Sequence, residues 1–72
     1  MPYRMRNPMV VVTKSPYQED TGLPWKYTPE NFKLWHSEVF LEAYKRDVPP
    51  MTIEERMGHL RTFGYELEVE EG

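Results

Sequence analysis

The chain has 72 residues, a formal net charge of −3, an aromatic share of 14% and no cysteine. A chain of this length makes one small domain that buries only about 60% of its unfolded surface. The lack of cysteine excludes disulfide bonds and thiolate metal sites, and the acidic balance disfavours a surface dedicated to nucleic acid. No apolar run reaches the roughly 20 residues of a membrane span, and the N-terminus does not have the pattern of a signal peptide. We therefore expect a single cytoplasmic domain over residues 1–72 that does not bind membranes.

The first half of the sequence predicts a basic arm, a strand and a long loop. Residues 1–8 form a polar arm that carries Arg4 and Arg6. Residues 9–14 contain three consecutive valines, whose branched side chains favour a strand. Residues 15–28 hold three aromatic residues, two prolines and one glycine, which predicts an irregular loop. This loop either packs across the following helix or contacts a partner through Tyr17 and Trp25, because aromatic residues concentrate at interface hot spots.

A long helix is predicted over residues 29–46. Thr28 is a suitable N-cap, and Pro29 suits the first helical position. Val48 precedes a proline pair, which ends the helix. Helical periodicity places one set of residues on a common core face: Phe32, Trp35, His36, Val39, Phe40 and Ala43.

Leu34 and Leu41 fall on the opposite side of this helix, among charged residues. Three interpretations are open for them. Another segment, for which the loop over residues 15–28 is the candidate, folds over the two leucines, they form a strip that binds a partner, or they are singly exposed residues of the kind found on most protein surfaces.

A second helix is predicted over residues 52–63. Thr52 and Glu55 have the spacing of a capping box at its start, and Gly64 is suited to the left-handed position after its end. Gly58 lies inside this helix, where we expect it to allow a close approach of the first helix.

Residues 65–70 alternate apolar and acidic side chains, which predicts a half-buried strand. The strand over residues 9–14 is its expected partner, with Lys14, Arg4 or Arg6 opposite the glutamates. The predicted fold is therefore α+β, a small β-α-α-β domain in which a two-stranded sheet from the chain ends packs on two helices. The relative direction of the strands is left open.

The sequence offers no set of residues for catalysis or metal binding. His36 lies on an apolar face and is expected to be a core histidine, whereas His59 is expected to be solvated. A zinc site needs three or four converging ligands, and neither a nucleophile with its base nor a phosphate-binding loop is present. We therefore expect a protein that is not an enzyme, with no catalytic residues, no metal and no cofactor.

DNA binding is one of two functions that the sequence suggests, and it is the less favoured one. The stretch from Leu60 to Glu68 resembles the helix-glycine-strand ending of some phage-repressor-like regulators. This resemblance implies a small helix-turn-helix-like transcriptional regulator that contacts DNA through Arg56 and Arg61. Glu54 and Glu55 oppose it, because they place two carboxylates at the start of the helix that would face the phosphates.

In length and make-up, the chain resembles small proteins that bacteriophages use to bind and redirect host machinery, such as inhibitors of bacterial RNA polymerase. Small toxin-neutralising proteins and CRISPR inhibitors share this profile. The resemblance implies a monomeric protein-binding regulator of host transcription that acts in the host cytoplasm. The residues expected to contact its partner are Arg4, Arg6, Tyr17, Trp25, Leu34 and Leu41.

Overall fold

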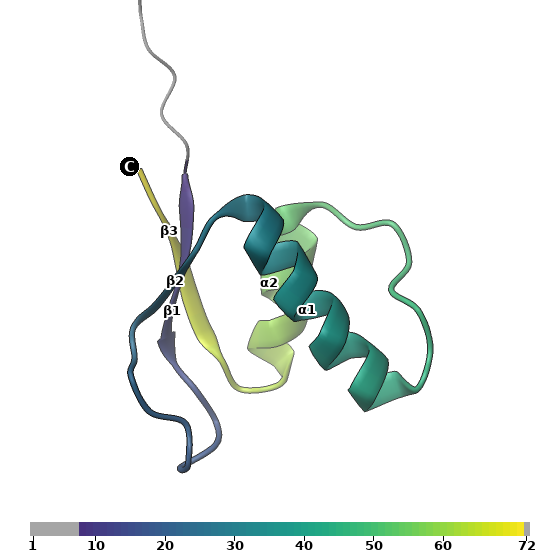
Figure 1. Cartoon of the computed structure of the whole chain (residues 1–72), viewed down its shortest axis with the longest axis horizontal. Coiled ribbons are helices and arrows are strands. Elements are labelled where there is room, and N and C mark those ends of the chain that lie inside the picture. Colours follow the sequence, from purple (N-terminus) through teal and green to yellow (C-terminus); the bar gives the residue numbers. More distant parts are fainter. Residues whose placement is uncertain (1–7, 72) are drawn as a thin grey trace, which may run out of the picture.

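The computed structural model describes residues 8–71, which form an α+β fold. Two helices lie on one side of a three-stranded antiparallel sheet with the order β2-β1-β3 (Figure 1). Within residues 8–71, neither helix is long and apolar enough to cross a membrane. Along the chain, the elements are β1 (Met9–Lys14), β2 (Trp25–Tyr27), α1 (Pro29–Tyr44), α2 (Ile53–Thr62) and β3 (Glu66–Glu70).

β2 lies within the segment that was predicted to be an irregular loop. Its three residues pair with β1 from Val10↔Tyr27 to Val12↔Trp25. A strand this short is too brief to show alternation, and its flanking proline and glycine are typical of turns. The edge of β1 favours the pairing, because backbone N–H and C=O groups in a buried strand need partners. The sheet therefore has three strands, and the prediction of two was wrong.

β3 pairs with the other edge of β1, as predicted, and runs antiparallel to it. The register extends from Met9↔Glu70 to Lys14↔Glu66, with an irregularity just before Lys14. Lys14 Nζ lies 4.0 Å from Glu66 Oε2, so the predicted attraction between Lys14 and the glutamates is present as an exposed ion pair. Such pairs contribute roughly 0–1 kcal/mol. Arg4 and Arg6, the other predicted cations, lie outside the described residues.

α1 begins where the sequence predicts and ends two residues earlier than expected. Thr28 Oγ1 accepts a hydrogen bond from the backbone of the first turn at 3.2 Å, and Pro29 is the first helical residue. At the other end, Lys45 has a left-handed φ of 58°, and its N–H donates to the Leu41 carbonyl at 2.7 Å. This residue ends the helix before the proline pair is reached.

The predicted core face of α1 is correct except at its last turn. Phe32, His36 and Phe40 are buried, but Ala43 is exposed. Tyr44 makes the contact at this turn, because its ring stacks on Phe63, the residue that follows α2, with the centroids 6.0 Å apart. Ala43 therefore lies beside the helix contact and not within it.

The capping box and the glycine at the end of α2 are confirmed. The Thr52 N–H donates to Glu55 Oε1 at 2.9 Å, and the Glu55 N–H donates to Thr52 Oγ1 at 3.1 Å. Gly64 has a φ of 107°. The following N–H, of Tyr65, donates to the Leu60 carbonyl at 3.2 Å, which completes the usual hydrogen-bond pattern of a glycine-ended helix.

The expectation for Gly58 was wrong. A Cβ atom added at this position would meet no atom within 4 Å outside the local helix backbone and the adjoining residues. The two helices do not approach each other at Gly58, so its lack of a side chain is not needed for their packing.

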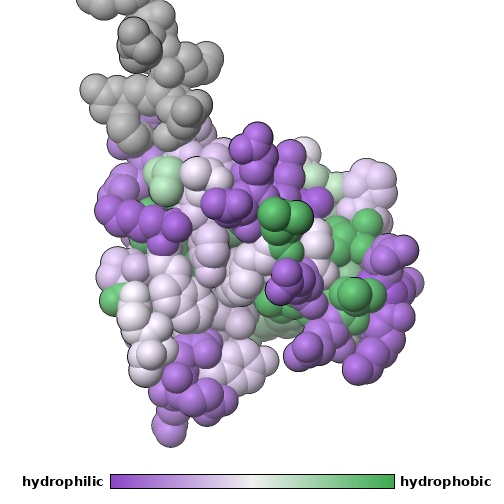
Figure 2. All heavy atoms as spheres, viewed as in Figure 1, coloured by the Kyte–Doolittle hydropathy of each residue, from purple (hydrophilic) through white to green (hydrophobic). Residues whose placement is uncertain are grey.

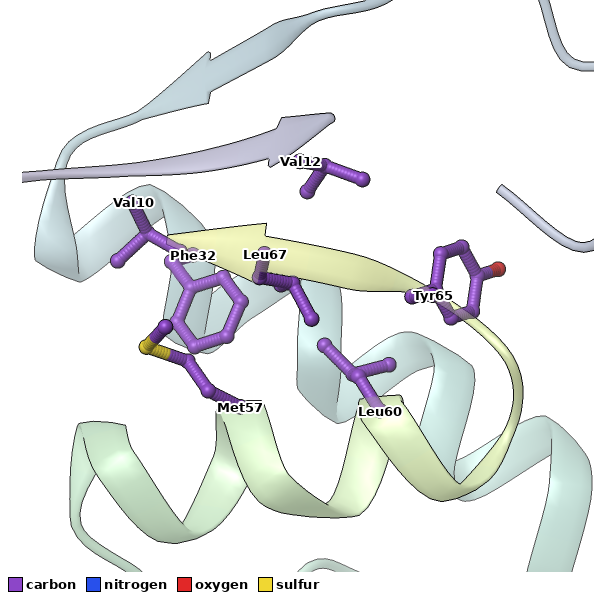
Figure 3. Packing of buried hydrophobic residues seen from close by; sticks show 7 residues of the cluster. All are labelled: Val10, Val12, Phe32, Met57, Leu60, Tyr65 and Leu67. Atoms are coloured by element: carbon purple, nitrogen blue, oxygen red, sulfur yellow. The ribbon is translucent and has the colours of Figure 1, made fainter. Parts of the chain in front are cut away.

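The main core fills the space between the sheet and the two helices (Figure 3). Strand side chains point down onto α2 and meet an aromatic ring from α1. The buried cluster consists of Val10, Val12, Phe32, Met57, Leu60, Tyr65 and Leu67.

Trp35 of α1 contacts other aromatic rings next to this core. Tyr27 stacks on it with the ring centroids 5.1 Å apart, while Trp25 and Tyr65 meet it edge-on at 6.0 and 5.5 Å. The aromatic residues of the segment 15–28 thus pack on the sheet side of α1. The interpretation in which this segment covers Leu34 and Leu41 was wrong.

Candidate protein-binding surface

The outer face of α1, which we define as the side that carries Leu34 and Leu41, has exposed apolar side chains. Leu34 is 64% exposed and Leu41 is 49% exposed. Their spacing of seven residues places them on one line along the helix, two turns apart. Figure 2 shows hydrophobic side chains over this part of the molecule, separated by hydrophilic ones. This surface has the mixed character that protein interfaces usually have.

Two grooves adjoin each other along this face and share Glu38 and Leu41. The first has a volume of about 580 Å³ and runs towards the end of the helix. Its lining residues are Glu38, Leu41, Glu42 and Lys45. The second, which we call the connector groove, has a volume of about 350 Å³ and lies between α1 and the segment that leads to α2. Its lining residues are Leu34, Ser37, Glu38, Leu41, Asp47, Val48 and Arg56.

Arg56 reaches the connector groove from inside the molecule. The residue is 9% exposed, and its Nη1 donates to His36 Nδ1 at 3.0 Å. Its Nε is buried without a hydrogen-bond partner, and no carboxylate of residues 8–71 lies within ion-pair distance of the guanidinium. Buried arginines normally have a charged partner. Here, within the described part of the chain, a neutral ring takes that place.

Arg56 begins a chain of hydrogen bonds that runs from α2 to α1, back to α2 and again to α1. His36 Nε2 lies 3.3 Å from His59 Nδ1, and His59 Nε2 lies 3.2 Å from the Tyr44 hydroxyl. The sequence analysis did not predict this series of hydrogen bonds. The expectation of a solvated His59 was wrong, because its ring is half-buried between the helices. Contacts between residues 15 or more positions apart leave no local pattern from which to predict them.

The direction of each hydrogen bond in this chain follows from Arg56. A guanidinium can only donate, so Nδ1 of His36 must accept, and the proton of the neutral ring lies on Nε2. That Nε2–H donates to Nδ1 of His59, whose own proton is then on Nε2 and points to the Tyr44 oxygen. All three bonds therefore point the same way, from Arg56 towards Tyr44.

This proton arrangement leaves the two histidines poorly suited to bind a metal. Both nitrogens of His36 are already used, one to accept from Arg56 and one to donate to His59. Within residues 8–71, the structure brings together no group of three or more potential ligands from His, Cys, Asp and Glu. A protein zinc site needs at least three ligands, so the histidine pair fits a structural contact better than a metal centre.

The charge state of His36 is set by its surroundings. Burial, with added repulsion from Arg56 and His59, lowers the pKa of His36 from its ordinary 6.5 to about 4. The ring is therefore neutral at physiological pH. This agrees with the hydrogen-bond directions, which require an acceptor nitrogen on His36.

The arginines of the DNA-binding alternative are both engaged within the molecule. Arg56 is buried, and Arg61 Nη2 donates to the Leu67 carbonyl of β3 at 2.9 Å. The first turn of α2 instead presents Glu54 and Glu55 to solvent. A helix with this distribution of charge would repel phosphates at the end that usually meets DNA.

Tyr17 and Trp25, the predicted contact residues of the segment 15–28, do not join the outer face of α1. Tyr17 is 53% exposed and lies edge-on to Tyr65, with the ring centroids 6.3 Å apart. Trp25 is half-buried in β2, and its indole N–H donates to the Thr21 carbonyl at 2.9 Å. Both pack on the sheet side of α1, so the structure separates them from the two leucines.

The sequence interpretation also missed residues that line the connector groove. Val48 was considered only as the residue before a proline pair, although an apolar side chain in a stiff connector was an available signal.

No family model, curated protein or solved structure shows significant similarity to this chain.

Proposed function

We propose that this chain is a non-enzymatic regulator that binds a larger protein through the outer face of α1. The observation that carries the proposal is the exposure of Leu34 and Leu41 on the side of the helix that the core does not use. Burying a leucine side chain stabilises a complex by roughly 1.5–3 kcal/mol. The charged residues beside the leucines would form the rim of such an interface.

The two grooves support the same proposal. Shape complementarity at an interface requires concave places that receive side chains of the partner. Glu38 and Leu41 line both grooves. A helix or loop of the partner that contacts these two residues would reach both grooves.

We further propose, from the resemblance in length and make-up, that the chain belongs to the class of small phage proteins that redirect host transcription. Bacterial RNA polymerase is then the first candidate partner, and the chain acts as a monomer in the host cytoplasm. Tyr17 remains a candidate for a second contact because its ring is exposed. Arg4 and Arg6 remain sequence-based candidates.

The test is an affinity pull-down from bacterial lysate, with and without nuclease, followed by binding to purified RNA polymerase on a size-exclusion column. The wild-type chain should recover the polymerase in both conditions, and the double variant Leu34→Ser/Leu41→Ser should not. Val69→Ser is a matched control, because Val69 is a similarly exposed apolar residue on β3.

Circular dichroism must first show that all three chains are folded, which is expected because exposed substitutions usually change stability by less than about 0.5 kcal/mol. Recovery that disappears with nuclease would point to nucleic acid. Equal recovery by the wild type and the double variant would exclude the outer face of α1 as the contact.

A further inference from the structure

We propose that the hydrogen-bonded chain Arg56–His36–His59–Tyr44 is an acid-sensitive lock that holds α1 against α2. The lock goes beyond the proposed function, because it is a property of this chain alone and needs no partner. Its three bonds have lengths of 3.0, 3.3 and 3.2 Å and alternate between the two helices. His36 and Tyr44 come from α1, whereas Arg56 and His59 come from α2.

The lock closes only while both imidazole rings are neutral. A neutral ring has one donor and one acceptor nitrogen, whereas a protonated ring has two donors. Protonated His59 would turn an N–H on Nδ1 towards the N–H on Nε2 of His36, where the nitrogens are 3.3 Å apart. Protonated His36 would likewise turn an N–H towards the guanidinium of Arg56, 3.0 Å away. Either event removes one hydrogen bond and replaces it with a repulsive contact.

The groups that face the two rings do not neutralise a new charge. From α1 and α2, the neighbours are one cation, one phenol and aromatic rings, namely Arg56, Tyr44, Phe32, Phe40 and Phe63. Within residues 8–71, no carboxylate forms a hydrogen bond or an ion pair with either ring, and the sheet provides no titratable group within hydrogen-bonding distance.

Two positive charges would then lie side by side in a contact that is largely closed to water, where charge repulsion is strong. The lowered pKa of His36 follows from the same burial and from the same neighbouring charges. In acid, separation of the two helices around the histidines relieves this repulsion.

Opening of the lock would alter the connector groove. One wall of this groove belongs to α1, the other belongs to the segment that leads to α2, and Arg56 reaches it from α2. The pairing of the three strands does not depend on the lock, because it consists of backbone hydrogen bonds between the strands. We therefore expect a local change at the helix contact at a higher pH than the loss of the sheet.

The test is an NMR titration of the ¹⁵N-labelled full chain from about pH 8 to about pH 4, a range that spans the ordinary and the lowered pKa of His36. At neutral pH, both rings should show the tautomer with the proton on Nε2. On acidification, the ring signals and the backbone amides of Phe40, Val48 and Arg56 should shift together. The amides of Val11 and Leu67, in the sheet, should shift only at lower pH.

Two variants separate the lock from a general effect of acid. His59→Asn keeps an acceptor oxygen near the position of Nδ1 but does not titrate, so the helix-contact transition should move to lower pH. Glu42→Gln removes an exposed carboxylate of α1 that takes no part in these bonds and should leave the transition in place. The proposal is overturned if either ring has its proton on Nδ1 at neutral pH, if helix and sheet amides change in one step, or if the helix-contact amides do not respond to acid.

Discussion

Arg56 and His36 form a buried pair in which a permanently charged guanidinium donates to a neutral imidazole across 3.0 Å. The contact joins α2 to α1 and sets the position of the proton on two histidine rings. It also leaves the positive charge of Arg56 without a carboxylate partner among residues 8–71. The pair therefore stabilises the helix contact only as long as the His36 ring stays neutral.

Stability should fall as the pH decreases from about 6.5 to about 4, the interval between the unfolded and folded pKa values of His36. Above this interval, the ring is neutral in both states and pH has no effect through it. Within the interval, the His36 ring binds a proton in the unfolded state but stays mostly unprotonated in the folded state, so acid favours unfolding. The slope is at most about 1.4 kcal/mol per pH unit, and the total is on the order of 3 kcal/mol.

Urea unfolding at a series of pH values measures this effect, and His36→Gln is the comparison, because glutamine does not titrate. The variant should show a smaller loss of stability than the wild type between about pH 6.5 and about pH 5, above the range in which most carboxylates titrate. The two proteins are compared by the slope of the unfolding free energy against pH, since the substitution also changes the unfolding free energy at neutral pH. Parallel curves for the two proteins would mean that His36 does not carry the effect.

Two glycines should respond in opposite directions to substitution with alanine. Gly64→Ala should destabilise the domain by more than about 1 kcal/mol, because its φ is 107° and the new Cβ would lie 3.0 Å from Pro16 Cβ. Gly58→Ala should stabilise it by about 0.5–1 kcal/mol, because the new methyl group meets open space inside a helix. Thermal and urea unfolding of both variants measure the difference, and a stabilising Gly64→Ala would contradict the backbone argument.

Two leucines on helices should differ strongly in their importance for stability. Leu60→Ala removes a fully buried side chain and should cost about 2–5 kcal/mol, enough to unfold much of so small a domain. Leu34→Ala removes a side chain that is 64% exposed and should change stability by less than about 0.5 kcal/mol. Circular dichroism in urea distinguishes the two. A large loss for Leu34→Ala would mean that its side chain packs against the domain in solution.

The start of α2 should depend on Thr52. Thr52→Ala removes the hydroxyl that accepts from the Glu55 N–H and should cost about 1 kcal/mol. Glu54→Ala is a suitable control, because Glu54 lies in the same turn but does not take part in the capping box. Urea unfolding should place the control close to the wild type, within a few tenths of a kcal/mol for the lost helix-dipole interaction. Equal losses in the two variants would contradict a specific contribution of the Thr52 hydroxyl.

Those parts of the fold that depend on neighbouring residues were predictable from the sequence. The caps at Thr28 and Thr52 and the glycine at position 64 follow from local hydrogen bonding and backbone freedom. The pairing of β1 with β3 followed because each strand had a strong local pattern and needed a partner. β2 was missed because its three residues are held by the edge of β1 and by packing on Trp35, neither of which is visible in a short stretch of sequence.

The candidate site was only partly predictable for the same reason. Helical periodicity alone placed Leu34 and Leu41 opposite the core. Whether they were covered depended on the course of the segment 15–28, which is decided by tertiary packing. The buried position of Arg56 was also out of reach, because a charged residue is normally expected at the surface and its partner lies 20 residues away.

The antiparallel pairing of β1 with β3 has a consequence for the order in which this protein acquires its structure on the ribosome. Met9 pairs with Glu70, about 60 residues later in the chain. The central strand is therefore synthesised early but keeps one unpaired edge until almost all of the described sequence has been made. Contacts between such distant segments slow folding, and an open strand edge favours association with other chains. The alternating glutamates of β3 arrive last and complete the sheet with a charged edge.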